Sequence, residues 1–145
     1  MIDIPENLKF EENFENLAIK ALRQVNLHGV NARFSEEITD SKIQVMFENQ
    51  GNLDEAILMA GEYRKFTAYE GNIAFIVATN RANVRNHSDK LAKVRYLMLP
   101  ENEHLNNEYY QILETREDGS STEISEELNS DITILTFTIK YLLIA

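Results

Sequence analysis

The chain contains no cysteine and no tryptophan, and only two prolines and five glycines among its 145 residues. The absence of cysteine excludes disulfides, thiolate nucleophiles and Cys-based zinc or iron–sulfur sites. The glycines never fall into GxGxxG or GxxxxGK spacing, which excludes the common phosphate-binding loops. No run of about 18 apolar residues occurs, and the acidic N-terminus lacks the basic and apolar regions of a secretory signal. We therefore expect neither a membrane span nor an export signal.

Charge is unevenly distributed along the chain, which has a formal net charge of −10. Residues 1–100 carry 12 Lys/Arg against 14 Asp/Glu, whereas residues 101–145 carry 2 against 10. An acidic total argues against nucleic-acid binding as the main role, because phosphate neutralisation supplies most non-specific affinity. Two segments of opposite sign stand out. A basic segment contains Arg81, Arg85, Lys90, Lys93 and Arg95, and an acidic one contains Glu114, Glu117, Asp118, Glu123, Glu126 and Glu127.

The N-terminal half predicts a helix followed by strands. Apolar residues at helical spacing run from Phe10 to Val25, and Gly29 suits the left-handed position that ends a helix. Alternating apolar residues predict short strands over 30–34 and 43–47. The composition of 49–54 predicts a turn, and the pattern over 53–66 fits either a helical turn or an early start of the next strand. Gly71 indicates a bulge or bend in that next strand.

The central strand is predicted at Ile73–Val77, where both alternating sets of side chains are apolar, so we expect it to pack on both faces. A polar loop over 80–86 precedes a helix that Ser88 caps and that ends at Pro100. Its buried face is predicted to hold Leu91, Val94 and Met98, leaving Lys90, Lys93 and Arg95 on other faces.

The last third predicts three strands. Tyr109–Thr115 and Thr122–Leu128 are expected to form a hairpin around the Asp118-Gly119 pair. A final strand places Leu135, Phe137, Ile139, Tyr141 and Leu143 on one face. The order of elements predicts one α+β domain over residues 1–145, a mostly antiparallel mixed sheet with two helices packed on it. Residues 1–8 are expected to form an N-terminal arm that is flexible or contacts a partner.

No set of catalytic, cofactor-binding or metal-ligating groups emerges. Glu101 and His104 have ExxH spacing but lie in a polar loop, which favours solvated residues over a metal site. His87, Ser88 and Asp89 are sequence neighbours, and such neighbours rarely converge on one reacting atom. We therefore predict that the chain is not an enzyme. The least favoured alternative is a hydrolase that uses carboxylates of the acidic segment.

Several segments together resemble a known family. The leading helix, the strand YEGNIAFIVATNR, the helix opening HSDKLAKVRYLM and the closing strands YYQILETRE and DITILTFTIKYLL are similar to phage tail terminator (tail completion) and related neck proteins. The resemblance extends from about Leu8 onward. It implies a small α+β virion protein without catalytic residues, which forms a hexameric ring that caps the head-proximal end of the tail tube and joins it to the neck. It also implies that the tail tube protein and neck or head-closure proteins are partners, and that the protein is assembled in the host cytoplasm.

Such a ring needs two different complementary patches on each subunit, and the basic and acidic segments offer opposite signs. We hypothesise that they meet between neighbours; alternatively, the acidic residues face a lumen through which DNA passes without specific binding. Two other functions stay open. One is a head-closure or connector protein of the neck, and the other is a small intracellular binding module with a pocket between helix and sheet.

Overall fold

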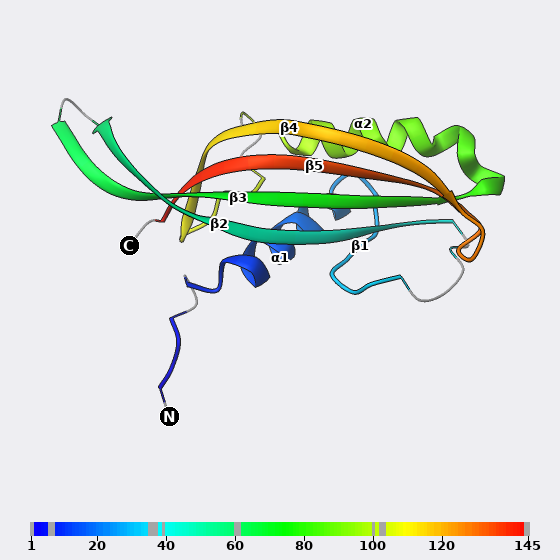
Figure 1. Cartoon of the computed structure of the whole chain (residues 1–145), viewed down its shortest axis with the longest axis horizontal. Helices are drawn as coiled ribbons and strands as arrows, with labels where there is room; N and C mark the ends of the chain where they lie inside the picture. The colour runs from blue at the N-terminus through cyan, green and yellow to red at the C-terminus, as the bar shows by residue number, and fades with distance from the viewer. Residues whose placement is uncertain are drawn as a thin grey trace.

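The computed structural model describes residues 2–5, 8–34, 38, 40–59, 62–99, 101 and 104–143, with side chains described except at 52–59, 62–67 and 84. Its elements are α1 (Phe10–Arg23), β1 (Gly29–Val30), β2 (Ser41–Met59), β3 (Glu62–Asn80), the 3₁₀ helix η2 (Arg81–Asn86), α2 (His87–Leu97), β4 (Tyr110–Ser125) and β5 (Ser130–Leu143) (Figure 1). The strands form one sheet in the order β1-β2-β3-β5-β4. Only β1 and β2 are parallel; the other neighbours are antiparallel. The predicted α+β fold with a mostly antiparallel mixed sheet is confirmed.

Helix α1 packs on one face of the sheet through a cluster of aromatic rings. Phe14 is fully buried, and its ring centroid lies 4.6 Å from that of Phe47 in β2 and 4.6 Å from that of Tyr141 in β5. The predicted helix is confirmed, but its end differs from the prediction. Asn26, with φ of 60°, supplies the left-handed residue that Gly29 was expected to supply. Gly29 instead lies close to α1, where an added Cβ would stand 2.6 Å from Leu22 Cδ1.

Strands β2 and β3 form a long hairpin. The prediction of a turn at 49–54 is wrong. β2 continues to Met59, and a register shift between Asn49 and Gly51 absorbs the turn-like residues as a bulge. Gly51 has φ of 130°, so this irregular position needs a glycine. The shift lies opposite Gly71, close to where the sequence predicted a bulge, although the extra residue is on β2. Over 53–59 and 62–66 the structure shows strand, which answers the question that the sequence left open there; residues 60 and 61 lie outside the described part of the chain.

The hairpin extends beyond the rest of the sheet, because the pairing of β3 with β5 runs from Asn80 only as far as Ala68 (Figure 1). Nearer the middle, β3 is the central strand of the sheet. Ile73, Phe75 and Val77 are buried beneath the helices, as predicted. In the alternate set Ala74 and Ile76 are half-buried and Ala78 is buried, so the expectation that both faces pack is only partly confirmed there.

Helix α2 begins two residues earlier than a cap at Ser88 predicts, and the expected loop before it is the 3₁₀ helix η2. Asn86 occupies the N-cap position, so the prediction that Ser88 caps the helix is wrong. Val94 and Met98 are buried as expected, but Lys90 is only 9% exposed, which contradicts its predicted position on an outer face. The helix has one face on the sheet, and the methylenes of a lysine can cover part of such a face.

Strand β4 runs unbroken from Tyr110 to Ser125, so the hairpin predicted around Asp118 and Gly119 is wrong. The two residues lie instead at a register shift between Glu117 and Gly119, and a second shift lies between Ile112 and Glu114. The chain reverses over 126–129, where Asn129 has φ of 49°. β5 then pairs with both β3 and β4, and its predicted inward residues through Tyr141 are buried, which confirms the last strand.

Candidate functional site

Some side chains of the basic segment are exposed, and others are buried or form ion pairs within the subunit. Arg81 and Arg85 are exposed on η2, whereas Lys90 is buried. On α2, Lys93 Nζ lies 3.3 Å from Asp89 Oδ2 one turn earlier, and Arg95 Nε donates to Glu117 Oε1 of β4 at 2.7 Å. The last contact joins the predicted basic and acidic segments within one subunit.

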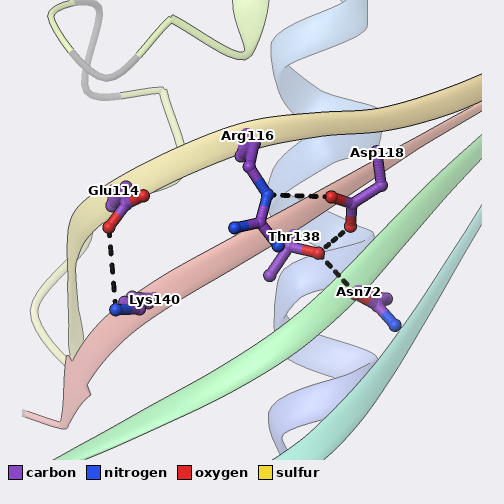
Figure 2. Close-up of polar contacts among 6 residues, drawn as sticks. All are labelled: Asn72, Glu114, Arg116, Asp118, Thr138 and Lys140. Atoms are coloured by element: carbon purple, nitrogen blue, oxygen red, sulfur yellow. Dashed lines mark hydrogen bonds and ion pairs between the residues drawn. The ribbon is translucent and has the colours of Figure 1, made fainter.

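The acidic segment is also partly neutralised by its own subunit (Figure 2). Arg116 Nε donates to Asp118 Oδ1 at 2.9 Å, and Lys140 Nζ lies 3.7 Å from Glu114 Oε2. The Thr138 hydroxyl lies between the Asp118 carboxylate and Asn72 Oδ1, 3.0 Å from the latter. The remaining predicted acids, Glu123 on β4 and Glu126 and Glu127 in the turn, are exposed. Charges that are segregated along the sequence are therefore interleaved in space around β4.

A buried polar cluster surrounds His87 at the start of α2. Its Nδ1 lies 2.7 Å from Thr79 Oγ1 of β3, and its Nε2 lies 2.8 Å from Thr133 Oγ1 of β5. Burial holds the pKa of His87 below its usual range; Asp131 opposes this shift and Lys90 adds to it. Ser88 and Asp89 are exposed while His87 is buried, so the helix does not bring this trio together. The cluster ties α2 to the sheet.

The α2–β4 groove is a hollow of about 240 Å³ lined by Arg95, Met98, Leu99, Thr115, Glu117 and Phe137. The Thr115 hydroxyl donates to the carbonyl oxygen of Met98 at 2.7 Å, which ties β4 to the end of α2. Met98 and Phe137 are almost fully buried, whereas Leu99 is 49% exposed. The groove thus has an apolar floor and a charged rim formed by the Arg95–Glu117 pair.

A second hollow of about 320 Å³ lies at the face of the sheet that the helices leave uncovered. Phe34, Ile76, Ile132 and Ile134 give it apolar walls, and Arg33, Glu123 and Glu127 lie at its border. Mixed charges at the border favour no single ligand chemistry.

Among the residues with described side chains, no three His, Asp or Glu side chains gather into a group that could hold a metal ion. Within the same part of the chain, no helix is long and apolar enough to cross a membrane. Glu101 is exposed and His104 is half-buried, and His104 lines a small hollow together with Leu97 and Leu105.

Comparison with known proteins adds no family to these observations. No protein-family model matches the chain, and no curated protein is significantly similar to it.

Sequence reasoning missed the α2–β4 groove. Tyr96 and Leu99 lie off the predicted buried face of the helix, and apolar residues at such positions were the available signal. The structure leaves them 54% and 49% exposed. The predicted interface residues fall at two places. Arg81 and Arg85 lie on η2 beside the β4–β5 turn that holds Glu126 and Glu127, since the Arg81 backbone N–H donates to the Asn129 carbonyl oxygen at 3.0 Å, whereas Arg95 and Glu117 lie at the groove.

Proposed function

We propose that this chain is a virion structural protein, a tail terminator that forms a ring on the head-proximal end of a tail tube and joins the tube to the neck. The observation that carries the proposal is the architecture. A leading helix, three strands, a second helix and two closing strands form an α+β fold, and both helices contribute to its main core. This is the arrangement that the resemblance implies. The proposed partners are other copies of the chain, the tail tube protein and neck or head-closure proteins.

The contact pattern also supports an assembly role. A ring requires a heterologous interface, in which two different surfaces of each subunit meet. The sheet has two unlike borders, since β4 forms one edge along its whole length, whereas β1 covers only Ile43 and Gln44 of β2 at the other. Long open edges favour contact with another chain. The exposed acids of the β4–β5 turn suit a lumen through which DNA passes, because like charges repel.

The test is the mass of the purified protein with and without the tail tube protein, followed by charge reversal. The double variant Arg81→Glu/Arg85→Glu replaces two exposed bases of the proposed interface; Lys90 is unsuitable because it is buried. We expect it to lose ring formation while its thermal unfolding stays close to that of the wild type. Arg23→Glu, also on an exposed arginine but in α1, is the matched control. Rings that assemble equally well in both variants would remove Arg81 and Arg85 from the interface.

A small intracellular binding module is the second candidate, and the α2–β4 groove favours it because the groove lies between a helix and the sheet. A chain that stays monomeric at all salt concentrations and does not bind tubes would support this candidate. A head-closure or connector protein of the neck would form rings but would bind neck proteins and leave the ends of tail tubes uncapped.

A further inference from the structure

The 3₁₀ helix η2 carries Arg81 and Arg85, the two bases of the proposed ring contact, yet none of its described side chains is buried. Its middle is held by one exposed hydrogen bond, from Asn83 Nδ2 to Asp40 Oδ1 at 3.2 Å. An element that buries so little depends on the contacts at its two ends. We propose that His87 is a positioning residue that holds the far end of η2, and that protonation of His87 releases η2 and weakens ring assembly. The proposal rests on the proposed function, because it names how that contact is positioned and regulated.

The near end of η2 is fixed by hydrogen bonds from groups that do not titrate. The Arg81 N–H donates to the Asn129 carbonyl oxygen at 3.0 Å, and the Ala82 N–H donates to Asn80 Oδ1 at 2.9 Å. Asn80 is itself buried, and its Nδ2 donates to the Ile38 carbonyl oxygen at 2.6 Å. We therefore expect this end to stay in place as the pH changes.

The far end of η2 is fixed by the imidazole ring of His87. The ring contacts Thr79 of β3 through Nδ1 and Thr133 of β5 through Nε2, and the Thr133 hydroxyl lies 2.9 Å from Thr122 Oγ1 of β4. Because η2 spans Arg81–Asn86, the contact between residues 79 and 87 closes a loop around it. The position of η2 thus depends on a single titratable side chain.

The first turn of α2 depends on this contact more than the rest of the helix does. Its buried residues, His87 and Lys90, are polar, whereas the later buried residues Val94 and Leu97 belong to the main core. Segments with few buried apolar contacts open at a lower free energy than the core. Loss of the His87 contacts should therefore release η2 and the start of α2 while the end of α2 stays packed.

Protonation of His87 weakens the contact in two ways. In the neutral ring one nitrogen accepts a hydrogen bond from a threonine and the other donates one, whereas both nitrogens of the protonated ring donate. The charge also lies in a buried site, where Lys90 repels it and Asp131 of β5 attracts it. The contacts from β3 and β4 are uncharged threonine hydroxyls, and the arginines of η2 are exposed. Burial is the largest of these effects, and it holds the pKa of His87 below its usual range.

The direction of the pH effect follows from this lowered pKa. The released form exposes His87 to water, where its pKa returns to about 6.5, so the released form binds a proton more readily than the held form. Release should become up to about tenfold more favourable for each pH unit below about 6.5, until the held form is itself protonated. Above about pH 6.5 release should not depend on the pH.

Hydrogen exchange of the wild-type protein at about pH 7.5 and about pH 5.5, corrected for the intrinsic pH dependence of exchange, tests the release directly. We expect amides in 84–93 to lose about five- to tenfold in protection at the lower pH, while those of β5 keep theirs. His87→Gln should make the protection of 84–93 independent of pH, because glutamine does not titrate. His28→Gln is the matched control, because His28 is an exposed histidine, and it should behave like the wild type.

Protection of 84–93 that does not change with pH in the wild type would overturn the proposal, and this result needs no variant. An equal change in His87→Gln and the wild type would also overturn it. Light-scattering mass at the same two pH values tests the link to assembly. Rings of the wild type and of His28→Gln should be lost at the lower pH, whereas rings of His87→Gln should persist. Wild-type rings that persist while η2 is released would overturn the regulatory role.

The proposal and the proposed function fail separately. Rings that cap tubes without a pH-dependent release of η2 would refute the role of His87 and leave the tail terminator function standing. A pH-dependent release in a protein that caps no tubes at neutral pH would establish His87 as the positioning residue of η2 and refute the tail terminator function.

Discussion

The substitution Gly71→Ala is expected to destabilise the fold through a single close contact. Gly71 lies in β3 opposite Asn49, at the edge of the β2 bulge. A Cβ added there would stand 2.4 Å from Phe47 Cζ, 2.8 Å from Phe47 Cε2 and 3.1 Å from the carbonyl oxygen of Glu48. Because ordinary contact begins at 3.4 Å, the edge of the Phe47 ring would have to move by about 1 Å.

Phe47 has little room for such a movement. Its ring centroid lies 4.6 Å from that of Phe14 and 6.1 Å from that of Tyr141, and the residue is only 6% exposed. Overpacking of this kind typically costs about 1–3 kcal/mol. For a domain of this size the cost corresponds to a fall of about 3–10 °C in the midpoint of thermal unfolding.

The assay is chemical and thermal unfolding of Gly71→Ala beside Gly119→Ala. An added Cβ at Gly119 meets nothing within 4 Å, so we expect that control to stay within about 0.5 kcal/mol of the wild type. Shortening the opposing ring with Phe47→Leu should make Gly71→Ala less costly than it is alone. A Gly71→Ala variant as stable as Gly119→Ala, or strict additivity with Phe47→Leu, would refute the close contact.

Three further predictions concern polar groups. Burial lowers the pKa of His87, so near this pKa the folded state binds fewer protons than the unfolded state. The free energy of unfolding should therefore keep its full value above about pH 6.5 and fall as the pH drops below it. His87→Gln should flatten this slope in denaturant titrations, and an unchanged slope would contradict the assignment. Arg95 and Glu117 should show a coupling below about 1 kcal/mol in a double-mutant cycle that fades at high salt, because both side chains are exposed by more than a third. Burial raises the pKa of Tyr141, whose hydroxyl donates to Asn49 Oδ1 at 2.7 Å, so Tyr141 should stay protonated while the protein is folded. The absorbance titration of the Tyr141→Phe variant should therefore match that of the wild type until alkaline unfolding begins.

The elements with strong periodicity were predictable from sequence. The run Phe10–Arg23 repeats its apolar residues every three or four positions over almost four turns, and the last strand alternates over nearly its whole length. In both cases one face is buried so extensively that a shifted register would expose the core. The fold class followed from their order.

The turns were the part that sequence misjudged, because the same residues suit turns and bulges. Asp118-Gly119 and the segment around Gly51 have turn composition, yet each is absorbed as a register shift inside a strand whose two ends stay paired. Long-range pairing decided the outcome, and local composition carries no information about it. Glu126–Asn129 lacks glycine, and the turn there depends on Asn129 in a left-handed conformation.

The candidate site was less predictable than the fold. Charge counts located the basic and acidic segments, but only the structure shows that Arg95 and Glu117 meet within one subunit and that Lys90 is buried. The α2–β4 groove depends on how α2 crosses an edge strand, and a single sequence does not specify that crossing.

The mass of the protein by light scattering, measured at low and moderate salt with and without the polymerising tail tube protein, tests the central claim most directly. We expect a hexamer, or a monomer whose copies assemble into a ring at one end of each tube and stop its growth. A protein that remains monomeric at every salt concentration and leaves tube growth unchanged would contradict it.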